Sequence, residues 1–289
     1  MSAGLNPQLV NLSSGPLAYY VLGNKGKIPL LFIHGHRSDA LRFQGLLKIL
    51  AQDTVVFAPD LPGCGQSPPY RQQWHSMAAY ARTLQELIEK IDLDQFILAG
   101  GSMGGVIALQ LYPLIAPRVS KMILFATPLG QQFFLPPFRY LSHFRFLLRA
   151  AIKSKIIPFL GQSLINCDSC MHWFYRHLSP IREAEEEVIK FEIRQWRAMR
   201  FRIWLETNYD LLGLNLLPQL KPISIPLLFL ETRHNPYYDQ TKNLAALKKI
   251  APHLEVVFLD WQTHIPRGEL DPGVLHKYQK YFRRFLKEK

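Results

Sequence analysis

Short apolar runs recur along the chain with helical stretches between them, and this alternation predicts βαβ units around a mostly parallel sheet. Several of these runs are apolar at every position, as expected for strands that are covered on both faces. The runs that we predict as strands are Leu17–Leu22, Ile28–His34, Thr54–Ala58, Phe96–Ala99, Met122–Ala126, Leu227–Glu231 and Glu255–Leu259.

Three stretches outside these runs have apolar residues at helical spacings of three and four, which predicts helices that pack against the sheet. The third stretch follows a Pro-Gly pair and predicts a closing helix at the end of the chain. The apolar positions are Met77, Ala81, Leu84 and Ile88, then Val106, Leu109 and Leu111, and finally Val274, Tyr278, Tyr281, Phe282 and Phe285.

The alternation stops between about Gly130 and Pro222, where the sequence becomes helical, aromatic and basic without a strand pattern. We therefore predict an α/β core of residues 1–129 and 223–289, with residues 130–222 inserted as a helical cap. Acidic residues at 183–187 suit the N-terminus of its longest helix. The apolar residues that we place near one face of that helix are Ile189, Ile193, Trp196, Ile203 and Trp204.

Residues 99–105 read AGGSMGG, and they follow an apolar run and precede a helical pattern. This is the context of the G-x-S-x-G turn that presents a nucleophilic serine. A strand that turns sharply into a helix has no room for side chains beside the turn, so glycine at Gly100 and Gly104 lets Ser102 adopt a strained conformation. We predict Ser102 as the nucleophile.

Acyl transfer also needs donors for the oxygen that becomes negative, and losing one such donor costs roughly 2.7–4 kcal/mol. Residues 33–36, IHGH, end another apolar run, where a backbone amide would face the serine turn. The predicted oxyanion donors are the backbone N–H groups of His36 and Met103. The alternative interpretation is that His34 and His36 are merely polar residues at a strand end.

The general base should be a histidine on a loop after the last strand, because it takes the serine proton and later returns it. His264 fits this position, since it follows the last predicted strand and precedes the closing helix. His253 precedes that strand and His276 falls inside the closing helix, so we predict both at the surface.

These motifs resemble the α/β-hydrolase superfamily, in its lid-bearing esterase and lipase-like branch. The resemblance rests on His34-Gly35, on DLPGCGQS at 60–67, on GGSMGG at 100–105 and on the late His264, and it covers nearly the whole chain. It implies the α/β-hydrolase fold, with a mostly parallel central sheet, helices on both faces and an inserted helical cap. It also implies that the 60–67 turn is structural and shapes the wall of the site.

The acid position departs from the family pattern. Where the family carries a Gly-x-x-Asp turn, residues 232–236 read TRHNP and place Asn235 at the acid position. An amide accepts a hydrogen bond from imidazole but does not offset its positive charge, and in serine enzymes such a change costs on the order of 10⁴ in turnover. Three interpretations stay open: Asn235 orients His264 in a slow enzyme, Glu231 or Asp239 reaches the imidazole, or hydrolysis has been lost.

The resulting hypothesis is a serine hydrolase that cleaves a carboxylic ester through an acyl-Ser102 intermediate. The Phe- and Trp-rich cap suggests an apolar acyl group or a lipid-like substrate, because apolar walls stabilise a bound chain by roughly 0.8 kcal/mol per CH₂. The alternatives are a hydrolase-fold protein that binds a ligand through a weakened triad, an acyltransferase, or a carbon–carbon bond hydrolase with the same serine.

Charge adds a further expectation. The net charge is +12, and residues 131–205 hold 12 Lys or Arg against 6 Asp or Glu. A basic cap suits an anionic membrane surface or an anionic substrate, and a solvated face without a partner is an equal alternative. Nucleic acid is not expected, because no binding motif accompanies the charge.

The cysteine count and the start of the chain bear on location. The three cysteines are too few for a disulfide framework, and the chain shows neither a signal-peptide pattern nor an apolar run of spanning length. We therefore expect a cytoplasmic protein, with peripheral membrane contact through the cap. We expect Cys167 and Cys170 to be two separate packed thiols rather than half of a zinc site or a redox pair, and we expect no metal or cofactor.

Overall fold

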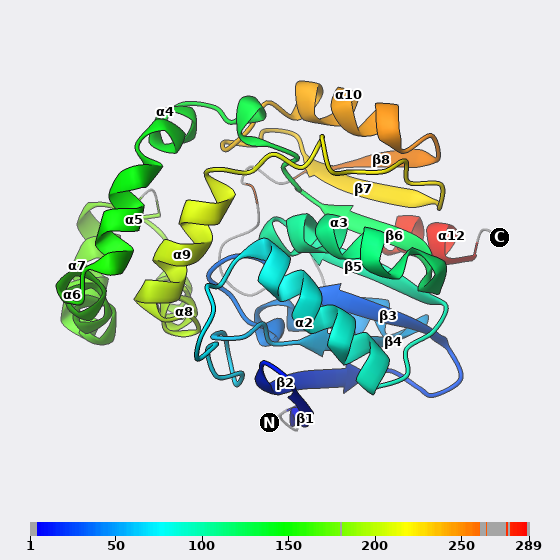
Figure 1. Ribbon diagram of the computed structural model, residues 1–289, viewed down its shortest axis with the longest axis horizontal. Coiled ribbons are helices and arrows are strands. Elements are labelled where there is room, and N and C mark those ends of the chain that lie inside the picture. The colour runs from blue at the N-terminus through cyan, green and yellow to red at the C-terminus, as the bar shows by residue number, and fades with distance from the viewer. Residues whose placement is uncertain (1–4, 180, 261–263, 265–275, 277, 288–289) are drawn as a thin grey trace.

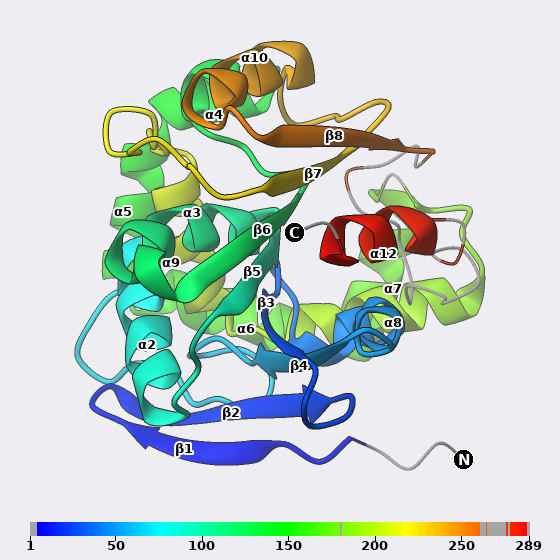
Figure 2. The same cartoon turned by 90° about the vertical axis from the view of Figure 1, so that its right-hand side faces the viewer.

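The computed structural model describes residues 5–179, 181–260, 264, 276 and 278–287. Its centre is one twisted sheet of eight strands in the order β1-β2-β4-β3-β5-β6-β7-β8 (Figures 1 and 2). The strands from β4 and β3 through β8 pair in parallel, whereas β1 and β2 add an antiparallel edge. The strands are β1 (Gln8–Leu12), β2 (Gly15–Leu22), β3 (Ile28–Ile33), β4 (Thr54–Pro59), β5 (Phe96–Gly101), β6 (Val119–Phe125), β7 (Leu227–Thr232) and β8 (Leu254–Leu259).

The seven predicted strands correspond to β2–β8, and the predicted fold class is confirmed. Strand β1 was not predicted. It lies at the sheet edge, pairs only with β2, and only its last residue is buried. An edge strand of this kind lacks the continuous apolar run that marks a strand covered on both faces.

Helices cover both faces of the sheet (Figure 2). Neighbouring residues of a strand alternate between the two cores. In β5, for example, Leu98 packs with α2 and α3, and Ile97 packs with α1 and α12. The helices on the first face are α2 (Met77–Lys90), α3 (Met103–Ile115) and α10 (Gln240–Ile250), and those on the second are α1 (Gln44–Leu50) and α12 (Gln279–Lys287). The predicted start of the closing helix at Val274 lies outside the described residues.

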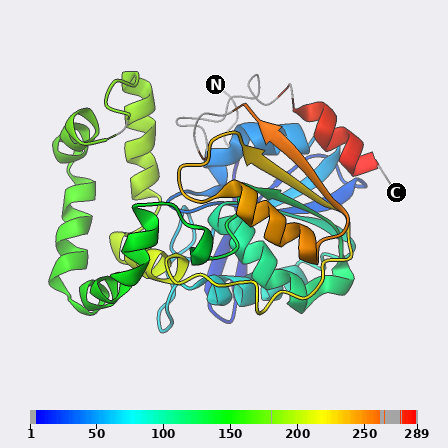
Figure 3. The same ribbon diagram turned by 90° about the horizontal axis from the view of Figure 1, so that it is seen from above.

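Six helices between β6 and β7 form a separate layer at one end of the sheet, which we call the helical insertion (Figures 1 and 3). No strand interrupts it among the described residues. The helices are α4 (Phe138–His143), α5 (Arg145–Lys153), α6 (Ile156–Asn166), α7 (Asp168–His177), α8 (Glu186–Arg197) and α9 (Phe201–Leu211). None of the described helices of the chain combines the length and the apolar character needed to cross a bilayer.

The prediction of one long helix through residues 189–204 is wrong, because α8 ends at Arg197 and α9 begins at Phe201. Backbone groups of the break bind the 60–67 turn: the Gly65 N–H donates to the Ala198 carbonyl over 2.9 Å, and Met199 forms a β-bridge with Cys64. A contact between distant segments thus ends the helix where the apolar periodicity continues.

Polar contacts join α8 and α9 to the core. The Glu192 carboxylate is fully buried and lies 3.0 Å from Arg42 and 3.1 Å from Arg37. On α9, Glu206 lies 2.6 Å from the His75 ring, and Asp210 accepts the Met77 N–H over 2.7 Å. Removing one partner of a buried ion pair costs about 3–5 kcal/mol, so these contacts fix the inner part of the insertion.

Cys167 and Cys170 form a disulfide at the start of α7, with their Cα atoms 5.3 Å apart. The prediction of two separate thiols is therefore wrong. The residues are three apart, and the turn from Cys167 into the first turn of α7 brings their side chains within bonding distance. Cys64 is a free and buried thiol.

Candidate active site

Ser102 occupies the sharp turn between β5 and α3, with φ 53° and ψ −117°. Its N–H donates to the Phe125 carbonyl over 2.8 Å, which ties the turn to β6. A Cβ on Gly100 would lie 2.5 Å from the Gly104 oxygen, and a Cβ on Gly104 would lie 2.1 Å from the Ile33 oxygen. Both glycines are thus required by backbone proximity, and this proximity holds Ser102 in its left-handed conformation.

His264 lies against this serine, with its Nε2 atom 2.8 Å from Ser102 Oγ. The rings of Tyr237 and Tyr238 stand edge-on to the imidazole, with centroids 4.8 and 6.2 Å away. The structure therefore brings together two residues that are 162 positions apart in the sequence. The aromatic neighbours did not follow from the sequence, where no pattern distinguishes them from packing residues.

Asn235 contacts the other side of the imidazole, and its amide orientation is set by a local turn. Its Oδ1 accepts the Tyr237 N–H over 3.0 Å, the Asx-turn that an Asn-Pro sequence favours. The NH₂ group therefore points the other way, where it lies 3.1 Å from Glu231 Oε1 and 3.0 Å from His264 Nδ1. One amide group thus donates to a carboxylate and to the imidazole.

This orientation determines the imidazole tautomer. Because the Asn235 NH₂ group has only donors to offer, His264 Nδ1 accepts and carries no proton. The proton of the neutral ring is then on Nε2, and it points at Ser102 Oγ. A general base needs a free Nε2, so the resting arrangement is the reverse of the one that takes a serine proton.

Glu231 lies behind Asn235 at the end of β7. Its buried carboxylate accepts the Tyr238 hydroxyl over 2.6 Å and the Thr232 N–H over 2.9 Å, besides the Asn235 amide. Burial raises the pKa of Glu231, and these donors oppose the shift. Asp239 caps α10 by accepting the Lys242 N–H. Of the three predicted candidates for the acid position, Asn235 makes the observed contact with the imidazole.

The two predicted oxyanion donors border the serine turn. Met103 is the first residue of α3, and the first N–H groups of a helix have no acceptor within it. The backbone of Gly35, the residue before His36, packs against the turn: a Cβ on Gly35 would lie 3.7 Å from Ser102 Cβ. Among the hydrogen bonds of the described residues, none uses the N–H of His36 or Met103.

Residues 28–265 match the family described as alpha/beta hydrolase fold. The chain belongs to this family. The predicted resemblance is thereby confirmed over most of the sequence.

Individual relatives of this alpha/beta hydrolase fold protein cover it to different extents. It is 32% identical over 124 residues to the dihydrolipoyllysine-residue acetyltransferase component of the acetoin cleaving system of Pseudomonas putida, a match of 43% of this chain and 33% of that protein. The chain spans about a third of the length of the first curated relatives that it matches. It is 26% identical to the pimeloyl-[acyl-carrier protein] methyl ester esterase of Legionella pneumophila, over 83% of this chain and 88% of that enzyme.

The solved structure of a hydrolase from Pseudomonas aeruginosa has the same fold as this family member. The TM-score is 0.74 at 17% identity, over 99% of this chain and all of that one. At this identity the likeness concerns the fold.

Two histidines of this hydrolase-fold chain hold the loop before the serine turn. His34 Nε2 accepts the Leu61 N–H over 3.0 Å, and its Nδ1–H donates to the Gly35 carbonyl over 2.9 Å. His36 Nε2 lies 2.9 Å from Thr207 Oγ1 on α9. Burial, and next the Arg37 charge, lower the pKa of His36 to about 3. Neutral His36 thus joins the loop to the insertion above it.

Hydrogen bonds join the ends of the 60–67 turn to each other and to neighbouring segments. Asp60 accepts the N–H groups of Ala40 and Gln66 over 2.9 and 2.8 Å, and Ser67 Oγ accepts the Ala18 N–H over 2.9 Å. Burial raises the pKa of Asp60 to about 6. These contacts agree with the structural role that the resemblance implies for the turn.

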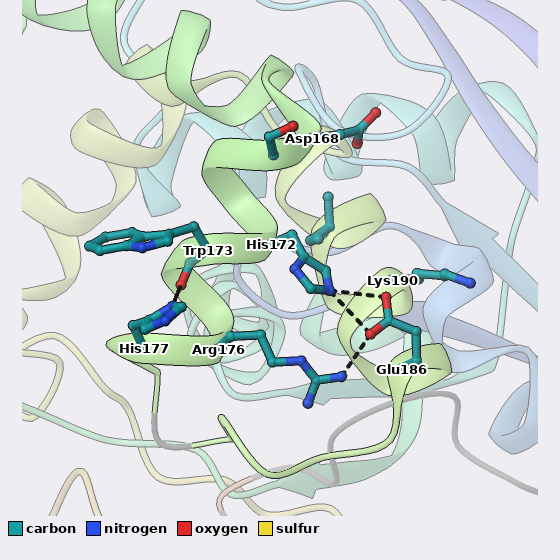
Figure 4. Close-up of a pocket in the computed structure, with 9 residues that line it drawn as sticks. Asp168, His172, Trp173, Arg176, His177, Glu186 and Lys190 are labelled. Atoms are coloured by element: carbon teal, nitrogen blue, oxygen red, sulfur yellow. Dashed lines mark hydrogen bonds and ion pairs between the residues drawn. The ribbon is translucent and has the colours of Figure 1, made fainter.

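A pocket of about 610 Å³ lies on the helical insertion between α7 and α8 (Figure 4). His172 Nε2 lies 3.1 Å from both Glu186 carboxylate oxygens, and Arg176 lies 2.7 Å from one of them. Neither Ser102 nor His264 lines this pocket, so it is separate from the serine site. Within the described part of the chain, no group of three or more His, Cys, Asp or Glu side chains is placed to hold a metal ion.

Proposed function

We propose that this protein is a serine hydrolase that cleaves a carboxylic ester through an acyl-Ser102 intermediate. The observation that carries this proposal is the 2.8 Å contact between His264 Nε2 and Ser102 Oγ on a strained turn. The similarity to a methyl ester esterase along most of both chains supports the reaction class.

In the proposed reaction, Ser102 Oγ attacks the ester carbonyl while His264 Nε2 takes its proton. The N–H groups of His36 and Met103 bind the tetrahedral oxyanion, and the imidazolium returns its proton to the leaving alcohol. Water then repeats both steps on the acyl-enzyme and releases the acid.

Proton transfer to Nε2 requires that His264 carry its proton on Nδ1 instead. For Nδ1–H to be accepted, the Asn235 amide must turn its oxygen towards the ring and lose its bonds to Tyr237 and Glu231. An amide in place of the acid costs on the order of 10⁴ in turnover in serine enzymes. We therefore propose a slow hydrolase, in agreement with the first of the three interpretations of the acid position.

An apolar acyl group or a lipid-like substrate suits the surroundings of His36. The Trp204 ring lies 6.4 Å from the His36 ring, and it packs against Trp196 and Phe201 at 5.6 and 5.3 Å. A hydrocarbon chain that binds against these aromatic side chains would gain roughly 0.8 kcal/mol for each buried CH₂.

The second candidate function is binding of such a ligand without turnover. The observation that favours it is the Asn235 NH₂ group, which faces the imidazole and holds it in the unproductive tautomer.

A fluorophosphonate probe and nitrophenyl esters of short and long acyl chains separate the two functions. A hydrolase is labelled by the probe and cleaves the esters, whereas the Ser102→Ala variant is neither labelled nor active. The matched control, Ser142→Ala on α4, should be labelled and should cleave the esters as the wild type does. If the wild type neither labels nor cleaves while a long-chain ester raises its Tm, hydrolysis is contradicted and the binding function holds.

A further inference from the structure

The exposed apolar side chains of this protein are concentrated on the helical insertion. In the described part of the chain, 13 of the 19 exposed large apolar side chains lie within residues 140–178. Soluble monomers scatter such residues singly, so a concentration of this size marks an interaction surface. The residues are Tyr140, Leu141, Phe144, Phe146, Leu147, Ile156, Ile157, Phe159, Leu160, Leu164, Trp173, Phe174 and Leu178.

Helix α6 shows how this surface is built. Its exposed apolar residues include pairs that are three and four positions apart and lie on one broad face, with Ile156 68% and Phe159 69% exposed. The opposite face packs inward: Ile165 is buried, and a Cβ on Gly161 would lie 2.1 Å from the Phe201 ring on α9. The helix thus packs one face against the protein and presents a second apolar face to solvent.

Basic residues accompany this apolar surface. Residues 131–177, which include α4 to α7, contain six Lys or Arg and one acidic residue, Asp168, which pairs with Arg197. On α5, Arg149 and Lys153 are exposed at helical spacing from the exposed Phe146. The exposed basic residues are Arg139, Arg149, Lys153 and Lys155, whereas Arg145 stacks on Tyr209 and Arg176 pairs with Glu186.

The position of these helices leaves the surface open. Helices α5, α6 and α7 lie at the end of the molecule farthest from the central sheet (Figures 1 and 3). Helix α9 lies between them and the core, and its Thr207 contacts His36 beside the serine turn. The outer helices are thus connected to the loop beside the serine turn through α9.

We propose that the exposed faces of α4–α7, which we call the docking face, bind the surface of an anionic lipid bilayer. The apolar side chains enter the boundary between headgroups and acyl chains, and the basic side chains pair with anionic headgroups. A second copy of the chain fits less well, because a symmetric contact would bring the exposed cations of one face close to the same cations of the other. Docking uses no residue of the serine site, so it is independent of the proposed hydrolysis.

Vesicle flotation of the full chain tests this proposal, with Ser102→Ala as the background so that catalysis plays no part. Phosphatidylcholine vesicles with and without phosphatidylglycerol are compared at low and high salt. We expect binding to the anionic vesicles, weakened by salt because exposed charges are screened.

Two double variants probe the two contributions. Phe159→Ser with Leu160→Ser removes apolar contact, and Arg149→Gln with Lys153→Gln removes charge, and each should lower the partition coefficient by about tenfold or more. The matched controls are Leu9→Ser with Leu114→Ser, and Lys248→Gln with Lys249→Gln, all at exposed positions on the core. The controls should bind as the parent does.

Three results would overturn the proposal: no binding to anionic vesicles, equal losses in the docking-face variants and their controls, or no loss in either docking-face variant. Sedimentation velocity adds a further check. If Phe159→Ser with Leu160→Ser converts a dimer to a monomer without affecting flotation, the face binds a second copy instead.

Discussion

The two sides of His264 are held in different ways. On the serine side, backbone atoms determine the geometry: β5, β3 and α3 approach so closely that only glycine fits at Gly100 and Gly104. On the other side, hydrogen bonds among side chains determine the geometry, and Asn235 presents an amide where the family pattern has an acid. The backbone geometry around Ser102 tolerates almost no change. On the other side, an amide nitrogen in place of a carboxylate oxygen at position 235 is enough to reverse the tautomer of His264.

The largest effect should come from restoring an acid beside the imidazole. Asn235→Asp alone would place two carboxylates side by side, since Glu231 Oε1 lies 3.1 Å from the amide nitrogen, and one of them would then hold a proton. The double variant Glu231→Gln with Asn235→Asp avoids this conflict. We expect it to raise kcat by about 10²–10⁴ on a nitrophenyl ester, because the new acid accepts Nδ1–H.

The single variant Asn235→Asp should give a smaller gain than the double variant, and Glu231→Gln alone should give none. These rates are compared by steady-state kinetics over a range of pH. A double variant no faster than wild type would mean that the amide is not what limits turnover.

The backbone side can be tested by adding one methyl group. In Gly104→Ala the new Cβ would meet the Ile33 and His34 oxygens at 2.1 and 2.5 Å, so we expect a loss of about 4 kcal/mol in the free energy of unfolding. Gly101→Ala is the matched control, because its Cβ would meet Phe125 Cβ at an ordinary 3.5 Å. Chemical denaturation measures both, and similar losses would show that proximity to β3 does not fix the turn.

The smallest effect should come from His36, whose side chain contacts Thr207 on α9 and so joins the serine side of the site to the insertion. Its pKa is lowered to about 3, so between pH 6.5 and 3 the unfolded chain binds a proton that the native protein does not. The free energy of unfolding therefore falls as the pH falls in this window. Relative to His36→Gln, the wild type should lose about 2–3 kcal/mol between pH 7 and pH 4.5.

Denaturation curves at several pH values measure this difference, with His276→Gln at an exposed position as the control. Parallel pH profiles for wild type and His36→Gln would show that His36 takes up its proton in the native protein.

The sequence predicted the elements that burial determines. The strands β2–β7 are recognisable because most of their residues are buried, and β8 is recognisable because it keeps an apolar run although it lies at an edge. Ser102 and His264 are recognisable because glycines and chain order mark them. Strand β1 was missed because its residues are exposed at an edge. The break between α8 and α9 was missed because Ala198 and Met199 bind a turn more than 130 residues earlier, and no local pattern records such a contact.

The acid side of the site was predicted only as a set of candidates. Asn235, Glu231 and Asp239 lie between the end of β7 and the start of α10, and spacing alone does not decide which side chain meets the imidazole. The Asx-turn with Tyr237 decides it, because it turns the amide, and the buried Tyr238 hydroxyl holds Glu231 behind it. Amide orientation depends on hydrogen-bond partners that are known only once the loop has folded.

Glu192 has a consequence for how movement passes through the molecule. Its carboxylate sits on α8 yet pairs with Arg37, the residue directly after the His36 N–H that we assign to the oxyanion. A shift of α8 would drag Arg37 with it, since separating a buried pair costs about 3–5 kcal/mol. A displacement of the outer helices would therefore reach the His36 amide through this carboxylate, in addition to the contact between His36 and Thr207.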